Sequence, residues 1–281
     1  TLAASLVSRQ ERMPEFDLDA EGVRKLGYAA VDLAAEHRAG LVERPVFGKV
    51  GAAASSFDEP LPETGEPIER VLAAVGERIL PRPFGNSHPR FFAFINATAD
   101  PVGIVADYLA ASMNSNCWGG DHAAIHVERQ VLRWLAAIIG FPGDSEGLLT
   151  SGGSMANFVG LAVARNSRAG IDVRAEGVAA IPRTLVTYAS VEVHSCVQKA
   201  IESLGLGAHS LHKVPVNAGY EIDVGALERI IAEDRAAGRQ PFCVIGNAAT
   251  INTGATDDLE QLAKLCEREQ LWFHVDGAIG A

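Results

Sequence analysis

Hydrophobic residues follow two different patterns along the chain, and the change comes near residue 140. Before it, apolar residues recur at the spacing of amphipathic helices, which predicts helices over residues 19–38, 67–80, 100–113 and 121–139. Beyond it, short apolar runs alternate with amphipathic stretches, a pattern typical of strands that alternate with helices. The predicted strands cover residues 148–150, 184–188, 210–214, 242–248 and 271–275. The predicted helices between them cover residues 154–165, 193–204, 223–236 and 257–269.

Strands and helices that alternate in this way indicate right-handed β-α-β crossovers and a mostly parallel sheet covered by helices on both faces. We therefore predict an α/β fold with two regions. Residues 1–80 form an N-terminal helical arm, with a connector rich in Gly, Pro and Glu over residues 40–66, and residues 81–281 form the sheet domain. Because the last predicted strand ends close to the last residue, we expect this domain to continue beyond residue 281.

The composition narrows the class of protein. Of the 281 residues, 48% are hydrophobic, which is enough for a large core, and no apolar run is long enough to span a membrane. The net charge of −11 argues against nucleic acid or an anionic membrane surface as a partner. The four cysteines, at positions 117, 196, 243 and 266, lie far apart. Their spacing argues against a metal site and favours a reduced, cytoplasmic compartment.

A glycine-rich turn, the stretch Thr150–Asn157, lies between the first predicted strand and the helix that follows it. Its two glycines allow a tight turn. Ser154 stands at the start of the helix, where free N–H groups and the helix dipole favour an anion such as phosphate. An ordinary capped strand-to-helix turn has the same composition. The stretch matches neither the Walker loop nor the dinucleotide fingerprint, which argues against a nucleotide cofactor.

Three further polar groups follow predicted strands, where ligands of α/β proteins bind. His194 opens a helix and could stack on a flat ring or transfer a proton, or it could simply cap the helix. The stretch Asn247–Thr253 offers hydrogen bonds to a ligand, as any polar loop would. Asp276 could keep a pyridine nitrogen protonated, although an aspartate in a turn after a strand is common. Their convergence with the glycine-rich turn favours a pyridoxal phosphate (PLP) site.

Nearly the whole chain resembles the group II PLP-dependent decarboxylases, the family of aromatic-L-amino-acid and glutamate decarboxylases. Besides the glycine-rich turn, the segments that carry the resemblance are His88–Phe94, Val191–Gly205, Asn247–Asp258 and His274–Gly280. It implies the large domain of a fold-type I PLP enzyme, the aspartate-aminotransferase-like architecture, after the N-terminal helical arm. It also implies that PLP is the cofactor and that the protein is a homodimer whose N-terminal helices embrace the partner subunit.

The resemblance implies roles for six residues of the cofactor site. Gly153 and Ser154 would hold the phosphate of PLP. His194 would stack over the cofactor ring as a catalytic residue. Thr250 would hydrogen-bond near the ring and its acidic partner.

That acidic partner would be Asp276, the second catalytic residue, which would pair with the ring nitrogen. Ala278 would pack against the ring. In the family, the segment that begins at His88 lines the substrate pocket, partly across the dimer interface. His88, Phe94 and Ile95 are therefore the candidate substrate-binding residues, and we expect no metal at the site.

The chain departs from the family at one essential position. The family's Schiff-base lysine follows the Asp strand in an Asp-x-His-Lys context, and the sequence ends before that point. The pair His212-Lys213 imitates the motif but precedes the Asp strand, so we interpret Lys213 as a surface or strand-end lysine. Met155 also differs, because many members have Glu there. We expect that residues 1–281 alone are not a complete catalytic unit.

For the complete protein, the resemblance implies decarboxylation of an L-amino acid to the amine and CO₂. The apolar character of Phe94 and Ile95 favours an aromatic substrate over glutamate. Another fold-type I PLP enzyme remains an alternative, such as a lyase, an aldehyde synthase or an aminotransferase, because these enzymes share the ring-binding residues. A non-catalytic protein is a further alternative if 281 residues are the full length.

Overall fold

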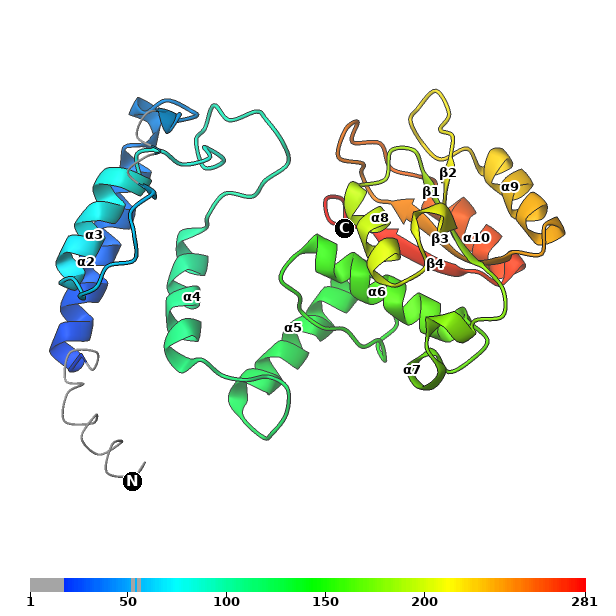
Figure 1. The fold of residues 1–281 in the computed structure, drawn as a ribbon, viewed down its shortest axis with the longest axis horizontal. Coiled ribbons are helices and arrows are strands. Elements are labelled where there is room, and N and C mark those ends of the chain that lie inside the picture. Colours follow the sequence, from blue (N-terminus) through cyan, green and yellow to red (C-terminus); the bar gives the residue numbers. More distant parts are fainter. Residues whose placement is uncertain (1–17, 52–53, 55–56) are drawn as a thin grey trace. The chain divides into compact units, whose positions relative to one another are not determined.

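The computed structural model describes residues 18–51, 54 and 57–281. The chain divides into two compact units, Thr1–Met113 and Asn114–Ala281 (Figure 1). The predicted arm, residues 1–80, is thus part of a longer first unit, and the predicted sheet elements belong to the second.

The first unit consists of helices and connectors, as the helical spacing predicted. Its helices are α2 (Ala20–Ala39), α3 (Ile68–Ala74) and α4 (Pro101–Met113), with a 3-10 turn at Leu41–Glu43 and a π-helical turn at Val75–Ile79. Asp19 caps α2, because its side chain accepts a hydrogen bond from the Gly22 N–H at 2.7 Å. Pro67 precedes α3 as its N-cap, and Pro101 is the first residue of α4, the position where the missing N–H of proline costs least.

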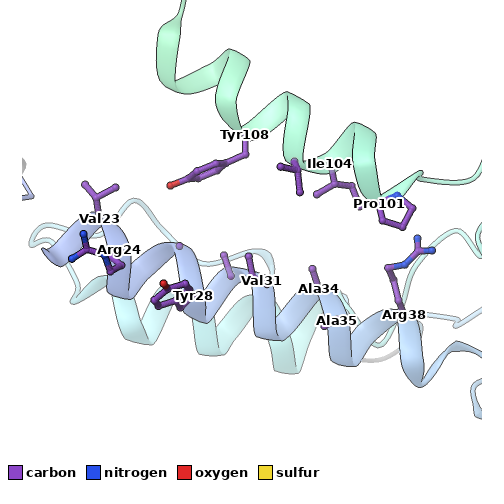
Figure 2. Close-up of a pocket in the computed structure, with 13 residues that line it drawn as sticks. Val23, Arg24, Tyr28, Val31, Ala34, Ala35, Arg38, Pro101, Ile104 and Tyr108 are labelled. Carbon is purple, nitrogen blue, oxygen red and sulfur yellow. The ribbon is translucent and has the colours of Figure 1, made fainter. Parts of the chain in front are cut away.

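The apolar faces of these helices stay largely uncovered within the unit. None of the three helices holds a buried residue. Tyr28 on α2 is 65% exposed, and Val105 and Leu109 on α4 are 58% and 57% exposed. A cavity of about 540 Å³ separates α2 from α4, and Figure 2 shows Ile104 and Tyr108 pointing from α4 toward α2. This unit has no core comparable with that of the sheet.

The second unit contains one parallel sheet of four strands. The strands are β1 (Leu185–Ser190), β2 (Leu211–Val214), β3 (Gln240–Asn247) and β4 (Trp272–Asp276), in the spatial order β2-β1-β3-β4. Every pairing is parallel, so all carboxyl ends lie at one edge of the sheet. The predicted α/β fold with a parallel sheet is confirmed.

Four helices of the second unit, α6 (Gly153–Arg168), α8 (Ser195–Ser203), α9 (Val224–Ala236) and α10 (Leu259–Glu269), cover the two faces of this sheet. The unit also contains α5 (Ala123–Ile139) and α7 (Val173–Glu176). One cluster of buried side chains joins the sheet to α6 and α8, and a second joins it to α9 and α10. Successive residues of a strand alternate between the clusters, because side chains point to opposite faces: Leu185 belongs to the first and Val186 to the second. All six residues of β1 are buried.

The prediction of a strand at residues 148–150 is wrong. Leu148 and Leu149 are 56% and 54% exposed, and neither takes part in any strand pairing among the described residues. An extended segment becomes a strand only where a neighbouring strand accepts and donates its backbone hydrogen bonds. A short apolar run cannot tell whether that neighbour exists. The other predicted strands and helices match observed elements to within a few residues.

A buried carboxylate fastens α9 to the sheet. Asp234 is 1% exposed. It accepts a hydrogen bond from the Tyr188 hydroxyl at 2.7 Å and from Nε of Arg239 at 2.6 Å, and its Oδ2 lies 2.8 Å from Nδ1 of His212. Burial and the neighbouring Asp234 carboxylate raise the pKa of Tyr188 well above its ordinary value. These contacts satisfy a charge that would otherwise be costly inside the protein.

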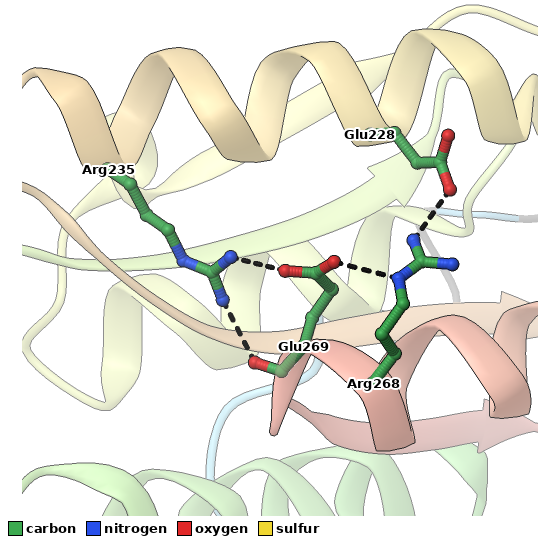
Figure 3. A network of polar contacts seen from close by, with 4 residues as sticks. All are labelled: Glu228, Arg235, Arg268 and Glu269. Atoms are coloured by element: carbon green, nitrogen blue, oxygen red, sulfur yellow. Dashed lines mark hydrogen bonds and ion pairs between the residues drawn. The ribbon is translucent and has the colours of Figure 1, made fainter.

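A second polar network joins α9 to α10 at the surface (Figure 3). Glu269 on α10 accepts from Arg235 on α9 and from Arg268, whose guanidinium also binds Glu228 on α9 at 2.6 Å. The hydrogen bonds from Arg235 and Arg268 lower the pKa of Glu269. Solvent reaches most of these side chains, so the network adds little stability.

Candidate active site

The carboxyl ends of β1, β3 and β4 bring the predicted site residues to one edge of the sheet. His194 follows β1, Thr250 follows β3, and Asp276 is the last residue of β4. Asn247 and Asp276 are register partners at the ends of β3 and β4. Beyond the strands, the Ala248 N–H donates to the Asp276 carbonyl at 2.9 Å. The loops that carry Thr250 and Asp276 are therefore joined by backbone hydrogen bonds.

Helix α6 packs alongside β4, and three positions on the helix each face one residue of the strand or of the turn after it. A Cβ atom on Gly153 would lie 3.6 Å from the Ala278 Cβ, and one on Gly160 would lie 2.7 Å from Cε1 of His274. Between these two glycines, Asn157 contacts Asp276. Residues 153, 157 and 160 share one face of a helix because they are four and three positions apart. The small residues on this face let α6 approach the acidic strand closely.

Asn157 connects the Asp276 carboxylate with two other side chains of the second unit. Its Nδ2 donates to Asp276 Oδ2 at 3.0 Å and to Cys196 Sγ at 3.4 Å, and its Oδ1 lies 2.6 Å from Nε2 of His274. Burial lowers the pKa of His274, and the nearby Asp276 carboxylate partly offsets this effect. His274 is therefore neutral at pH 7. Burial and the Asp276 charge also raise the pKa of the Cys196 thiol, so Cys196 is a packed side chain rather than a nucleophile.

The other Asp276 oxygen faces the turn that follows β4. Oδ1 accepts a hydrogen bond from the Ala278 N–H at 3.2 Å. A carboxylate has about four acceptor positions, and the two donors Asn157 and Ala278 fill only part of that capacity. Asp276 is incompletely buried, so a cationic ring nitrogen could still reach it.

The N-terminus of α6 suits a phosphate. Its N-cap residue is Gly152, with φ 152°, and no side chain caps the first turn. Ser154 is exposed beside these N–H groups. An uncapped helix N-terminus favours an anion through its N–H groups and its dipole. Gly153 is close to Ala278, so the phosphate end and the Asp276 turn belong to one site, and the residues present fit PLP.

His194 and Thr250 lie on the loops that follow β1 and β3. His194 is the N-cap of α8, and its Nδ1 accepts a hydrogen bond from the Cys196 N–H at 3.3 Å, which leaves the rest of the exposed ring available for stacking. Thr250 is only 3% exposed, and its hydroxyl lies 2.7 Å from that of Thr253. This contact orders the loop. A bond from Thr250 to Asp276 does not occur among the described contacts, and its predicted role stays a prediction.

The buried side chain of Asp257 holds the end of β3, where the loop that carries Thr250 begins. Asp257 accepts hydrogen bonds from the backbone N–H and the side-chain amide of Asn247 at 2.7 and 3.0 Å. It also accepts from the Ile222 N–H at 2.7 Å. These bonds fix the end of β3 at the register that places Asn247 beside Asp276.

The three predicted substrate-binding residues belong to the first unit. His88 is 4% exposed; its Nδ1 accepts from the Arg90 N–H at 3.0 Å, and its buried Nε2 has no hydrogen-bond partner among the described residues. Phe94 is 77% exposed, has a φ of 61°, and stacks on Phe84 at a ring distance of 5.8 Å. Ile95 is 50% exposed. Their role in substrate binding stays a prediction.

Lys213 lies on β2, at the opposite side of the sheet from β4. Three strand spacings, about 14 Å, separate these two strands. Lys213 is exposed, as expected for a strand-end lysine, and partial desolvation lowers its pKa. Its distance from the Asp276 strand separates it from the candidate site.

Two further findings concern metal binding and membrane-spanning helices. Among residues 18–51, 54 and 57–281, no group of three His, Cys, Asp or Glu side chains could hold a metal ion. No helix in this described part is both long enough and apolar enough to cross a membrane.

Two residues of the site, Asn157 and His274, were not predicted from the sequence. A signal was present for each: Asn157 falls one helical turn after Gly153, and His274 precedes Asp276 by two positions and so shares its side of the strand. What the sequence could not show is that α6 packs on that side of β4.

Comparison with known proteins identifies the family. A model described as the pyridoxal-dependent decarboxylase conserved domain matches residues 51–281. An aromatic-L-amino-acid decarboxylase of Bacillus atrophaeus is 37% identical over 270 residues, which is 95% of this chain and 54% of the relative. A phenylacetaldehyde synthase of Arabidopsis thaliana is 28% identical over 273 residues, which is 93% of this chain and 55% of the relative.

A solved structure shares the fold. The structure of Oryza sativa TDC with PLP and tryptamine superimposes with a TM-score of 0.82 at 25% identity, over 92% of this chain and 55% of that chain. The chain spans about half the length of the curated relatives it matches. The predicted fold-type I architecture is confirmed, and the chain belongs to the pyridoxal-dependent decarboxylase family.

Proposed function

We propose that the protein is a PLP-dependent decarboxylase that converts an L-amino acid to the amine and CO₂. The observation that carries this proposal is the geometry of one sheet edge. There, Asp276 at the end of β4 lies against α6, whose uncapped N-terminus faces the same turn. A carboxylate and an uncapped helix N-terminus at one edge of the sheet suit the two charged ends of PLP.

The chain's own residues would perform three tasks. The N–H groups at the start of α6 and the Ser154 hydroxyl would bind the phosphate. The His194 ring would cover one face of the bound ring, and its neutral form could hold a proton near the reacting carbon. Asp276 would keep the ring nitrogen protonated, because an ion pair favours the charged form. When bound, PLP supplies the electron sink that accepts the electrons left by the departing CO₂.

We propose an aromatic amino acid as the substrate. Phe94 and Ile95 present apolar surface, and Phe84 stacks on Phe94. The aromatic-L-amino-acid decarboxylase of Bacillus atrophaeus is a relative of this chain, which supports the proposal. The alternative is an aldehyde synthase, and the Arabidopsis thaliana phenylacetaldehyde synthase supports it.

We further propose that the protein is a cytoplasmic homodimer and that its first unit contributes to the dimer contact. The cavity between α2 and α4 is lined almost entirely by apolar side chains (Figure 2). The exposed faces of these helices need a covering surface, and a second copy of the chain supplies one. The free thiols of the described part, three of them buried, agree with a reduced compartment.

We propose that the lysine that carries the cofactor is not Lys213, because β2 lies three strand spacings, about 14 Å, from β4. Borohydride reduction of the complete protein with PLP, followed by peptide mapping, locates the modified lysine. We expect the adduct on a lysine other than Lys213. An adduct on Lys213 would contradict this assignment.

Product analysis tests the proposed function. The complete protein is incubated with PLP and each aromatic amino acid, and CO₂, amine, aldehyde and hydrogen peroxide are measured. We expect amine and CO₂ in equal amounts; aldehyde with peroxide would favour the alternative. The Asp276→Asn variant should lose about 100- to 1000-fold in turnover, by analogy with the loss of other charge-stabilising groups. Near-normal turnover would contradict the role of Asp276.

A further inference from the structure

The orientation of the Asn157 amide is fixed by its neighbours. A carboxylate oxygen only accepts hydrogen bonds, so the group that faces Asp276 Oδ2 at 3.0 Å must be the NH₂ of Asn157. Its Oδ1 then faces Nε2 of His274 at 2.6 Å, and this nitrogen must carry the proton that is donated. The polar contacts therefore form a directed chain from His274 through Asn157 to Asp276.

The protonation state of His274 agrees with this direction. Burial lowers the pKa of His274, so the imidazole is neutral and holds a single proton. The hydrogen bond to Asn157 requires that proton on Nε2. His274 is therefore a fixed donor for Asn157 rather than a second charge beside Asp276.

The helix is shaped to admit the His274 ring. A Cβ atom on Gly160 would lie 2.7 Å from Cε1 and 2.9 Å from Nδ1 of His274, closer than real side chains approach. Gly160 is three residues from Asn157 and on the same face of α6. Glycine at this position lets the ring come near enough to hold the Asn157 amide.

We propose that Asn157 is a positioning residue that holds the Asp276 carboxylate in the orientation that receives the ring nitrogen of PLP, with His274 locking the amide. This inference rests on the proposed function, because it requires PLP in the site. Asn157 acts through Asp276, whose second oxygen is held by the Ala278 N–H.

A purely structural role for Asn157 makes a different prediction. Asn157 is 4% exposed, and if it only filled space, its removal would lower stability and change PLP affinity independently of Asp276. If it acts through Asp276, its removal matters only while Asp276 is present. A double-mutant cycle separates the two cases.

The experiment measures PLP affinity by equilibrium dialysis in the purified protein. The variants are Asn157→Ala, Asp276→Ala and the double substitution. A hydrogen bond to a charged group is worth about 10- to 100-fold in an equilibrium constant, so we expect Asn157→Ala to weaken PLP binding by about that factor. In the Asp276→Ala background, Asn157→Ala should add little further loss.

Cys196→Ala is the matched control. It removes the other acceptor of the Asn157 amide from the same buried region but leaves the bond to Asp276. We expect its PLP affinity to stay close to that of the unsubstituted protein. A loss equal to that of Asn157→Ala would mean that any disturbance here weakens binding, and would overturn the proposal.

A second measurement does not require PLP. The ¹⁵N chemical shifts of His274 report which ring nitrogen carries the proton, and we expect the Nε2–H form at pH 7.

His274→Gln keeps an N–H donor and should retain most of the PLP affinity, whereas His274→Phe should lose it. An Nδ1–H form, or equal affinity in the two His274 variants, would contradict the locking role.

The outcomes separate this inference from the proposed function. If the unsubstituted protein does not bind PLP, both are wrong. If Asp276→Ala binds PLP normally, the assigned site is wrong, and the inference falls with it. If Asp276→Ala weakens binding while Asn157→Ala does not, or if the two losses add, only the positioning role is overturned.

Discussion

The two units of the chain use apolar residues in opposite ways. In the second unit, all six residues of β1 are buried and two clusters cover the faces of the sheet. In the first unit, α2, α3 and α4 hold no buried residue, although α4 is strongly apolar. The sheet thus buries its own apolar residues, whereas the helices of the first unit leave theirs exposed. The residues of the candidate cofactor site lie on the unit that holds the sheet, and we propose that a second copy covers the helices of the other unit.

The largest expected effect is on the free energy of unfolding, and it tests the difference between the two units. Leu227 on α9 is fully buried, and Leu227→Ala should lower the free energy of unfolding by about 2–5 kcal/mol, because it removes apolar contacts and leaves a cavity. Leu109→Ala on α4 is the matched control: Leu109 is 57% exposed, and the change should cost less than about 0.5 kcal/mol in a monomer. Urea denaturation measures both. Equal losses would remove the distinction between the units.

The next effect concerns the surface of the helical unit. Val31 and Ile104 line the cavity between α2 and α4, and Val31→Glu with Ile104→Glu would place charges on the face that we propose a second copy covers. We expect the dimer dissociation constant to rise by at least about 10-fold, because buried unpaired charges are costly. Analytical ultracentrifugation measures it. Ala232→Glu, on the exposed side of α9, is the control and should leave the dimer intact. An unchanged dimer dissociation constant in the double variant would contradict the proposal that a second copy covers the helices of the first unit.

The sequence located the elements of both units with one exception, but it could not show which neighbours they pair with or pack against. Short apolar runs bounded by turns identified the strands that bury both faces, and the polar residues after them lie at one edge of the sheet. The apolar run Leu148–Thr150 had the same pattern but has no paired neighbour among the described residues. Helical spacing located α2 and α4, but an amphipathic pattern does not say which surface covers the apolar face.

The contacts of Asn157 show the same limit inside the site. Its partners His274 and Asp276 are 117 and 119 positions away in the chain. Residue types and spacing placed Asp276 at the end of a strand and Ser154 at the start of a helix. Only the packing of α6 on β4 brings Asn157 between them.

A smaller effect is expected in how the free energy of unfolding changes with pH. Burial lowers the pKa of His274 in the folded state, so below the unfolded value, about 6.5, the unfolded chain binds more protons than the folded one. Stability should therefore rise with pH through this window and fall as the pH drops below about 6.5. Urea unfolding from about pH 7.5 to 5.5 measures the slope. His274→Gln should make the slope shallower, and an unchanged slope would contradict the burial of a neutral imidazole.

The smallest expected effect is at the surface of the sheet unit. Arg235→Gln removes one partner of Glu269 from the network in Figure 3. Exposed ion pairs contribute about 0–1 kcal/mol, so the loss in unfolding free energy should be in that range and should shrink in high salt. Denaturation at low and high salt measures it. A loss as large as that of Leu227→Ala would show that surface charges, rather than the apolar core, hold α9 and α10 together.

A crystal structure of the protein with PLP would show directly whether Asp276 pairs with the ring nitrogen. We expect the phosphate at the N-terminus of α6, the ring beside His194, and the ring nitrogen within about 2.6–3.2 Å of an Asp276 carboxylate oxygen. We also expect that Asn157 still donates to the other side of that carboxylate. A cofactor bound elsewhere, or a ring nitrogen that faces a group other than Asp276, would contradict it.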